Sequence, residues 1–255
     1  MPRAWYGRVL RSPHAHARIV SIDTSAAEGL GAVCLTFADV PRIKYNERIV
    51  STPPHLYRDR YVLADKARHV GEAVAAVAAP TEALAEKAVR AIRVEYEVLP
   101  VLLSAEDALK DGAARIHETV LLHGKEIPIE NNVAVTRLVE VGDIAKGFAE
   151  ADSIIEREFQ TSPIYHAQME TKSVVCKPAA DGSITVWAST QSIHNTRQLL
   201  AELYDLPLHK VNVKKVALGG SFGSSIQMNS VTPICVGLAI KSGRPVKIAT
   251  TREED

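Results

Sequence analysis

The sequence has no excess of charge of either sign, because thirty Lys and Arg residues balance thirty Asp and Glu residues. This balance gives no indication of a nucleic-acid-binding surface, which is normally basic, or of a highly charged tail. The sequence also shows no signal peptide and no apolar run approaching the roughly 18 residues of a membrane span. We therefore expect a cytoplasmic protein that binds neither nucleic acid nor membrane.

Cysteine is scarce. The three cysteines, Cys34, Cys176 and Cys235, lie far apart, and each sits in an apolar run. That spacing favours buried thiols in a reducing compartment over a disulfide framework or a CxxC metal site. It also offers no pattern for an iron–sulfur cluster. The 255 residues, of which 46% are apolar, are enough for one large domain or two smaller ones.

The N-terminal part alternates strand and helix patterns. Residues 73–79 form an apolar run that predicts a buried strand, and Thr81 is placed to cap a helix that continues to Ala91. Residues 111–132 carry little periodicity and predict a linker. The other elements expected before this linker are strands at 5–11, 17–23, 32–37 and 93–98, helices at 24–30 and 104–110, and a long loop at 41–61.

The part after the linker is richer in strand patterns, and residues 178–182 carry a hairpin signal between two of them. The expected strands are 133–141, 153–160, 171–177, 183–188, 211–218 and 245–250, and the expected helices are 143–149, 192–204 and 227–240.

A glycine-rich turn, Gly219-Gly220-Ser221-Phe222-Gly223, joins the strand 211–218 to the helix 227–240. Glycine has no Cβ, so its backbone can approach a ligand closely, and a following helix N-terminus offers free N–H groups. The turn matches neither GxGxxG nor GxxxxGK[ST]. The alternative interpretation is an ordinary tight turn between a strand and a helix that binds no ligand.

Gln191 follows the strand 183–188 and precedes a helix. Ligands in open sheets bind beyond the carboxyl ends of the strands. Because Gln191 and the glycine-rich turn both follow strands, we expect them to meet at one rim. The Gln191 amide should face an open cleft there, with free N–H groups of residues 220–223 beside it.

Two histidine segments are weaker candidates. His14 and His16 form an H-x-H pair that could bind a metal, but no third ligand lies nearby, which favours a structural role. His166 could be a general base. With Gln168 and Glu170 close to it, a buried hydrogen-bonded cluster is the favoured alternative, and an acid such as Glu170 beside an apolar strand needs a partner.

The order of motifs resembles the xanthine dehydrogenase and aldehyde oxidase family over nearly the whole chain. Each motif is weak alone, and their combination is specific. The first three are similar to segments of that family's a/b hammerhead domain, and the last three to segments of its molybdopterin-binding domain. The motifs are LRSPHAHARI at 10–19, HVGEAVA at 69–75, VEYEVLPV at 94–101, STQS at 189–192, GGSFG at 219–223 and TREED at 251–255.

The resemblance implies an α+β fold with a hammerhead domain at 1–110, a linker at 111–132 and a truncated, mixed α/β molybdopterin-binding domain at 133–255. It implies an enzyme that hydroxylates purines, N-heterocycles or aldehydes with oxygen from water. Gln191 would then hydrogen-bond an oxo ligand of molybdenum. The backbone of Gly219, Gly220, Ser221 and Gly223 would cradle the molybdopterin, with Phe222 packing beside it, and the protein would supply no direct metal ligand.

Three departures from the family pattern bear on function. Ser221 replaces the middle glycine of the family turn. Ile226 stands where purine-converting members carry a substrate-binding acid, which argues against xanthine, and Gln227 is the candidate to replace that acid. The family's later half, with its glutamate general base, has no counterpart here, so no residue is assigned a catalytic role.

We therefore expect a component of a molybdenum hydroxylase that needs a partner chain with the rest of the molybdopterin domain. An iron–sulfur subunit and an FAD subunit are further partners implied by the family, since this chain shows no site for either group. The alternative is a non-catalytic fragment or assembly module that keeps the fold. A hydrolase-like enzyme has no nucleophile elbow to support it.

Overall fold

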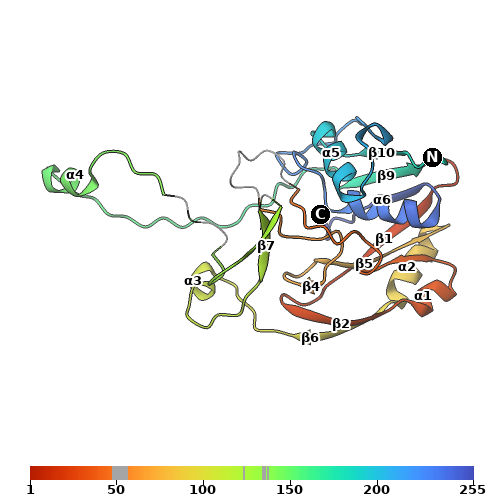
Figure 1. The fold of residues 1–255 in the computed structure, drawn as a ribbon, viewed down its shortest axis with the longest axis horizontal. Coiled ribbons are helices and arrows are strands. Elements are labelled where there is room, and N and C mark those ends of the chain that lie inside the picture. Colours follow the sequence, from red (N-terminus) through yellow and green to blue (C-terminus); the bar gives the residue numbers. More distant parts are fainter. Residues whose placement is uncertain (48–56, 123, 134–135, 137) are drawn as a thin grey trace.

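The computed structural model describes residues 1–47, 57–122, 124–133, 136 and 138–255. Its centre is a seven-stranded mixed sheet in the order β11-β10-β9-β12-β1-β5-β3, accompanied by a three-stranded sheet, β4-β2-β6, and a β7–β8 hairpin. Figure 1 shows these layers as one body, with a long arm projecting from it. This is the α+β architecture that the sequence predicts.

Most expected strands and helices form within two or three residues of their predicted bounds. The strands are β1 Trp5–Arg11, β2 Ala17–Asp23, β3 Val33–Leu35, β4 Lys66–Ala67, β5 Ala73–Ala79, β6 Arg93–Val98, β7 Thr119–Leu122, β8 Lys125–Pro128, β9 Ser173–Pro178, β10 Ile184–Ala188, β11 Val211–Lys214 and β12 Val246–Ala249. The helices are α1 Ser25–Gly29, α2 Glu82–Ala91, α3 Ala105–Ala108, α4 Ile144–Glu150, α5 Ile193–Leu203 and α6 Val231–Ser242, with a short 3-10 helix at Leu208–Lys210.

The central sheet crosses the expected domain boundary. β1, from the N-terminal part, pairs in parallel with β12, from the C-terminal part, with Trp5 opposite Val246. At this seam Gly7 lies against Ile248, so close that a Cβ on Gly7 would be 2.6 Å from Ile248 Cγ1. The two halves of the chain therefore share one sheet. The boundaries of 1–110 and 133–255 stay predictions.

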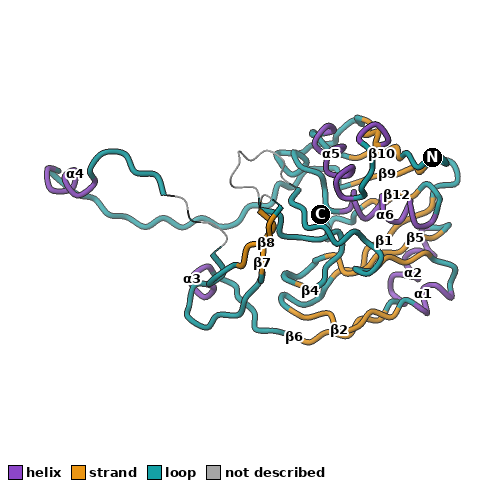
Figure 2. The backbone as a smooth tube through the Cα atoms, in the orientation of Figure 1, coloured by secondary structure: helices purple, strands orange, loops and turns teal. Residues whose placement is uncertain are grey.

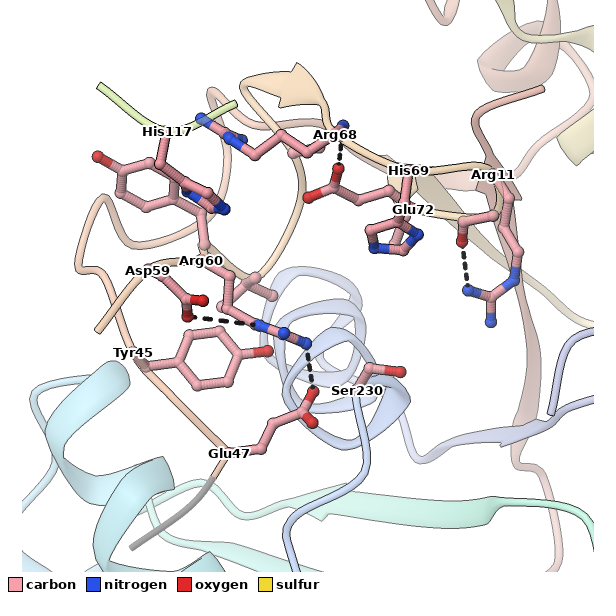
Figure 3. Close-up of a pocket in the computed structure, with 15 residues that line it drawn as sticks. Arg11, Tyr45, Glu47, Asp59, Arg60, Arg68, His69, Glu72, His117 and Ser230 are labelled. Carbon is pink, nitrogen blue, oxygen red and sulfur yellow. Dashed lines mark hydrogen bonds and ion pairs between the residues drawn. The ribbon is translucent and has the colours of Figure 1, made fainter. Parts of the chain in front are cut away.

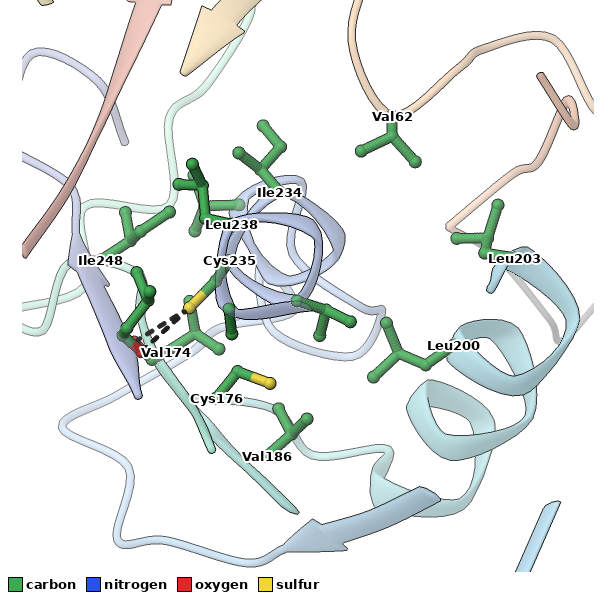
Figure 4. Close-up of a cluster of buried hydrophobic side chains, with 14 of the residues drawn as sticks. Val62, Val174, Cys176, Val186, Leu200, Leu203, Ile234, Cys235, Leu238 and Ile248 are labelled. Atoms are coloured by element: carbon green, nitrogen blue, oxygen red, sulfur yellow. Dashed lines mark hydrogen bonds between the residues drawn. The ribbon is translucent and has the colours of Figure 1, made fainter. Parts of the chain in front are cut away.

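The largest core lies between this sheet and α6. All nine residues from Val231 to Ala239 are buried, and Figure 4 shows α6 among other buried side chains, with Cys235 directed toward Val174 of β9. Cys34, Cys176 and Cys235 are free and buried, as predicted. Burial raises the pKa of Cys34 to about 11 and that of Cys176 to about 12, so both remain protonated thiols.

Local capping explains why several helices begin where the sequence predicts. The hydroxyl of Thr81 accepts the Leu84 N–H at the start of α2, and the Asp143 carboxylate accepts the Lys146 N–H at the start of α4. Each side chain satisfies one of the N–H groups that a helix start leaves unpaired. No helix in the described residues is long and apolar enough to cross a membrane.

Two elements beside the glycine-rich turn differ from expectation. β11 ends at Lys214 instead of 218, and α6 begins at Val231 instead of 227. The residues between them form turns, because the Ser221 hydroxyl and carbonyl take the N–H groups of Ser225 and Ser224. The expectation that a helix starts just after the turn was therefore wrong.

The expected linker 111–132 also has more structure than predicted. β7 and β8 form a hairpin within it, and Lys44 anchors this hairpin through the Thr119 carbonyl and Glu126. The expected loop 41–61 carries an isolated bridge between Tyr45 and Arg60. Its residues 48–56 lie outside the described part of the chain.

Residues 138–164 form the arm that Figures 1 and 2 show projecting from the body. α4 forms there, but the strands expected at 133–141 and 153–160 are absent from the described residues of those ranges. Ala134, Val135 and Arg137 lie outside the description. The prediction of strands was wrong for this chain by itself, because an alternating segment becomes a strand only when another strand supplies hydrogen bonds.

Candidate functional site

Gln191 and the glycine-rich turn meet, as their positions after two strands predict. The Ser221 hydroxyl donates to Gln191 Oε1 at 3.0 Å, and the Gln191 backbone N–H donates to the Ser225 carbonyl at 2.8 Å. Gln191 remains exposed while Ser221 and Ser225 are buried. The amide therefore lies at an open surface and not in the core.

The turn needs its glycines for two different reasons. Gly220 and Gly223 have left-handed φ angles of 107° and 104°, which residues with a Cβ rarely adopt. Gly219 instead packs against Glu170, and a Cβ there would lie 2.8 Å from the Glu170 Cβ. The Glu170 carboxylate accepts the Gly219 N–H, which is the partner that an acid at this position requires.

The turn presents a row of hydrogen-bond donors. The backbone N–H groups of Gly220, Ser221, Phe222 and Gly223 have no hydrogen-bond partner among the residues that the structure describes. Successive free amides of this kind attract oxygen atoms of an anionic or oxo ligand. With the exposed Gln191 amide beside them, these donors fit the oxygen-rich groups of a molybdopterin cofactor.

Lys172 supports the turn through hydrogen bonds of its side chain. Its local sequence gives no indication of this role. Its ammonium donates to the hydroxyls of Ser224 at 2.6 Å and Ser225 at 3.1 Å. Burial lowers the pKa of Lys172, while the negative charges of Asp255 and Glu170 oppose that shift. A lysine at the start of a strand is common on protein surfaces, so only the fold reveals its contacts.

A second polar cluster joins the turn to the last residues of the sequence. Gln168 is 1% exposed and donates to the Asp255 carboxylate, which also accepts the Lys172 backbone N–H and the Tyr165 hydroxyl. The buried hydrogen-bonded cluster favoured from the sequence is confirmed for Gln168 alone, because Glu170 binds the Gly219 N–H instead. His166 lies outside it, exposed, with its Nε2 near Gly223.

The remaining predicted site residues lie around the turn. Phe222 has a left-handed φ of 49° and its side chain is 78% exposed, while Ile226 is 49% exposed. Gln227 is bound through its carbonyl by the Thr190 hydroxyl at 3.3 Å. Their proposed roles beside cofactor or substrate stay predictions.

His14 and His16 do not form a joint site. The His14 ring packs edge-on against Tyr96, with ring centroids 5.0 Å apart, whereas the buried His16 ring lies with Nδ1 2.7 Å from the Pro100 carbonyl. Within the described residues, no group of three His, Cys, Asp or Glu side chains could hold a metal ion. The two rings therefore make separate packing and hydrogen-bond contacts, and the structural role expected for the pair stays a prediction.

A cavity of about 220 Å³ lies elsewhere in the molecule (Figure 3). Arg60 forms ion pairs with Glu47 and Asp59 there, and the Glu72 carboxylate accepts the Arg68 backbone N–H. Its lining does not include Gln191 or the glycine-rich turn. These charged groups balance one another, so we do not assign the cavity to the chemistry at the turn.

Comparison with known families covers most of the chain. Residues 1–100 match the "Aldehyde oxidase and xanthine dehydrogenase, a/b hammerhead domain", and residues 127–255 match the "Molybdopterin cofactor-binding domain".

Among curated proteins, a probable xanthine dehydrogenase subunit of Bacillus subtilis (strain 168) is 38% identical over 99% of this chain and 32% of its own length. The nicotinate dehydrogenase large molybdopterin subunit of Eubacterium barkeri is 32% identical over 99% of this chain and 56% of its own length. The chain thus spans about a third to a half of the relatives named here.

Solved structures agree with these matches. Quinoline 2-oxidoreductase from Pseudomonas putida 86 superposes with a TM-score of 0.82 at 28% identity, over 100% of this chain and 32% of its own. The sequence motifs and the fold therefore agree, and the chain belongs to the xanthine dehydrogenase and aldehyde oxidase family, with its a/b hammerhead and molybdopterin cofactor-binding domains.

Proposed function

We propose that this chain is the N-terminal part of the molybdenum-cofactor-binding subunit of a hydroxylase. Its substrate would be a purine, another N-heterocycle or an aldehyde, and the inserted oxygen would come from water. The names of two relatives, one a xanthine dehydrogenase component and the other a nicotinate dehydrogenase component, support an N-heterocycle. Ile226, apolar where purine-converting members carry an acid, favours a heterocycle other than xanthine.

The observation that carries this proposal is the contact between Gln191 and the glycine-rich turn. Together they place an exposed side-chain amide beside four backbone N–H groups that have no hydrogen-bond partner among the described residues. A bound molybdenum cofactor would supply the metal centre for oxygen insertion and electron uptake. The chain's own part is to hold the cofactor's oxygens with neutral donors, which stabilise negative charge without changing protonation.

The site lacks an assigned general base within the described residues. Glu170, an acid in contact with the turn, already accepts the Gly219 N–H. We therefore propose that the base, and the rest of the pterin pocket, come from a polypeptide with the remaining molybdopterin half. An iron–sulfur subunit and an FAD subunit would complete electron transfer, and the buried free thiols fit assembly in the cytoplasm.

The arm supports a partner of this kind. Ile155, Phe159 and Ile164 are 78%, 88% and 89% exposed. Their segment alternates like a strand but finds no neighbouring strand in the described part of this chain. Exposed apolar segments with unpaired backbone groups are sites of association, and strands of the missing half would supply both kinds of contact.

The arm alone would also suit a non-catalytic assembly module, so cofactor content separates the two functions. We would co-express the chain with the remaining molybdopterin half of the Bacillus subtilis relative and purify the complex. We expect about one molybdopterin per complex, and turnover of nicotinate, hypoxanthine or an aldehyde by the complex but not by the chain alone.

Gln191→Ala should lower turnover by about 10²-fold, the usual cost of one donor to a developing negative charge. The matched control is Gln198→Ala, because Gln198 is an exposed glutamine on α5 that donates to Glu202, away from the turn. A complex that forms without molybdopterin would support the assembly module instead. Turnover by the isolated chain would contradict the need for a partner.

A further inference from the structure

Among the described residues, the Gln191 side chain has one hydrogen-bond partner, Ser221, which stands where the family turn has glycine. A glutamine amide can be rotated by 180° to exchange its oxygen and its NH₂ group. Only the NH₂ group can donate to an oxygen ligand. The orientation of this amide therefore decides whether Gln191 attracts or repels such a ligand.

Two hydrogen bonds at Ser221 select one orientation. The Ser225 backbone N–H, which can only donate, points at Ser221 Oγ at 3.0 Å. The Ser221 hydroxyl hydrogen is then free to go to Gln191 Oε1, also at 3.0 Å. In the rotated amide the Gln191 NH₂ group would face Ser221 Oγ, and the Ser221 hydroxyl hydrogen would lose its acceptor. Ser221 is only 8% exposed, so water could not easily replace that acceptor, and the rotated orientation is unfavourable.

The backbone allows a side chain at this position. Gly220, Phe222 and Gly223 have left-handed φ angles, but Ser221 does not. A serine therefore fits here without the strain of a left-handed φ, which the neighbouring Phe222 does carry. Ser225 is itself fixed, because its hydroxyl accepts from Lys172 and its carbonyl accepts the Gln191 N–H.

We propose that Ser221 is a positioning residue that orients the Gln191 amide so that its NH₂ group is the free donor of the site. Gln191 Nε2 has no hydrogen-bond partner within the described ranges. The inference deepens the proposed function, on which its chemical meaning rests. Lys172 contributes indirectly by holding Ser224 and Ser225 in place.

The first test needs no cofactor. The full chain is labelled with ¹⁵N-glutamine, and the Gln191 NH₂ signals are identified by their absence from Gln191→Ala. We expect the ¹⁵N–¹H NOE of this NH₂ group to be high in the native chain and to fall by about twofold or more in Ser221→Ala, because the amide becomes mobile.

Ser221→Thr keeps the hydroxyl and should keep the high NOE. Ser221→Gly removes the side chain without adding atoms. It should lower the NOE as Ser221→Ala does, and it serves as the second variant if Ser221→Thr does not fold. Ser183→Ala, which removes an exposed hydroxyl bound to Asp181, should change nothing. Equal NOE values in the native chain, Ser221→Ala and Ser221→Gly would overturn the proposal.

The second test uses the cofactor-containing complex. Ser221→Ala should lower kcat by about tenfold with KM unchanged, and Ser221→Thr should restore it, as expected for an interaction that matters in the transition state. An unchanged kcat in Ser221→Ala would overturn the positioning role. A complex without molybdopterin would contradict the proposed function, while the NOE comparison would still decide the role of Ser221.

Discussion

The body and the arm both contain apolar sequence but place it differently. In α6 every residue from Val231 to Ala239 is buried, whereas in the arm Ile155 and Phe159 are 78% and 88% exposed. Each segment carries an apolar pattern that predicts a regular element. The difference shows that an apolar pattern indicates which side chains a segment could bury. Whether those side chains are buried depends on the rest of the fold.

The two regions also differ in what stabilises their helices. α6 is stabilised by tertiary packing on the sheet (Figure 4). α4, with seven residues, has the Asp143 cap and a solvent-exposed Lys146–Glu150 pair, and none of its residues is buried. Isolated helices of this length are marginal in water. We expect the arm to open locally without unfolding the body.

The strongest contrast should come from two large apolar residues. Leu238→Ala in the core should lower the free energy of unfolding of the isolated chain by about 2–5 kcal/mol, because it leaves a cavity. Phe159→Ala in the arm should change it by less than about 0.5 kcal/mol. Urea unfolding followed by circular dichroism measures both. A comparable loss in both variants would show that the arm packs on the body.

The seam between the halves should be the next most sensitive place. Gly7→Ala would force a Cβ to within 2.6 Å of Ile248 Cγ1 in the core, and we expect a loss of about 1–3 kcal/mol from overpacking. The control is Gly29→Ala, because a Cβ at Gly29 would meet nothing within 4 Å apart from its chain neighbours and its own helix backbone. Thermal unfolding should separate the two variants, and equal melting temperatures would contradict a tight seam.

His117 tests whether the expected linker belongs to the body. Burial, followed by the positive charge of Arg68, lowers the pKa of His117 from 6.5 to about 4, with smaller effects of Asp59, Lys66 and Glu118. The unfolded chain then binds a proton below pH 6.5 that the folded chain does not bind until about pH 4. Stability should therefore fall as the pH falls through this window.

At pH 5 the loss of folding stability caused by His117 should be on the order of 1 kcal/mol, allowing for the partial exposure of the ring. His117→Gln should remove this part of the pH dependence while leaving stability at pH 7.5 nearly unchanged. Urea unfolding of both proteins from pH 7.5 to 4.5 checks the prediction. Parallel stability curves for the two proteins would show that the ring is solvated and the segment detached.

The smallest expected effect compares two helix caps. Thr81→Ala on α2 should cost the whole chain about 1 kcal/mol, since α2 packs on the body. Asp143→Ala removes the equivalent bond on α4 but should leave global stability unchanged. Hydrogen exchange should show faster exchange of the α4 amides alone. Global destabilisation by Asp143→Ala would place α4 within the cooperative unit.

Some elements of the fold could be predicted because their signals are local. The apolar run of Ala73–Ala79 and the Thr81 cap determine β5 and the start of α2 without reference to distant residues. The absence of a strand at 153–160 could not be predicted from the segment alone, because a strand forms only beside a partner strand. The β1–β12 seam was also invisible, because nothing in either segment states which strand lies beside it.

The candidate site divides in the same way. Gln191 and the glycine-rich turn were identified because each follows a strand and matches a family motif. The residues that fix them were missed or only partly seen: Lys172 has no local signal, and Glu170 was recognised as needing a partner without the partner being known. Their roles follow from contacts with residues about 50 positions away, at Ser224 and Gly219.

By itself, the sequence determined the fold class, the family, the helix caps and the pair formed by Gln191 and the glycine-rich turn, because these depend on periodicity, local hydrogen bonds and short motifs. The tertiary structure decided that both halves share one sheet, that the arm's apolar residues stay exposed, and that Ser221 donates to Gln191. Each of these depends on which distant groups meet, and the free energy of such contacts is set by geometry and burial that no single segment encodes.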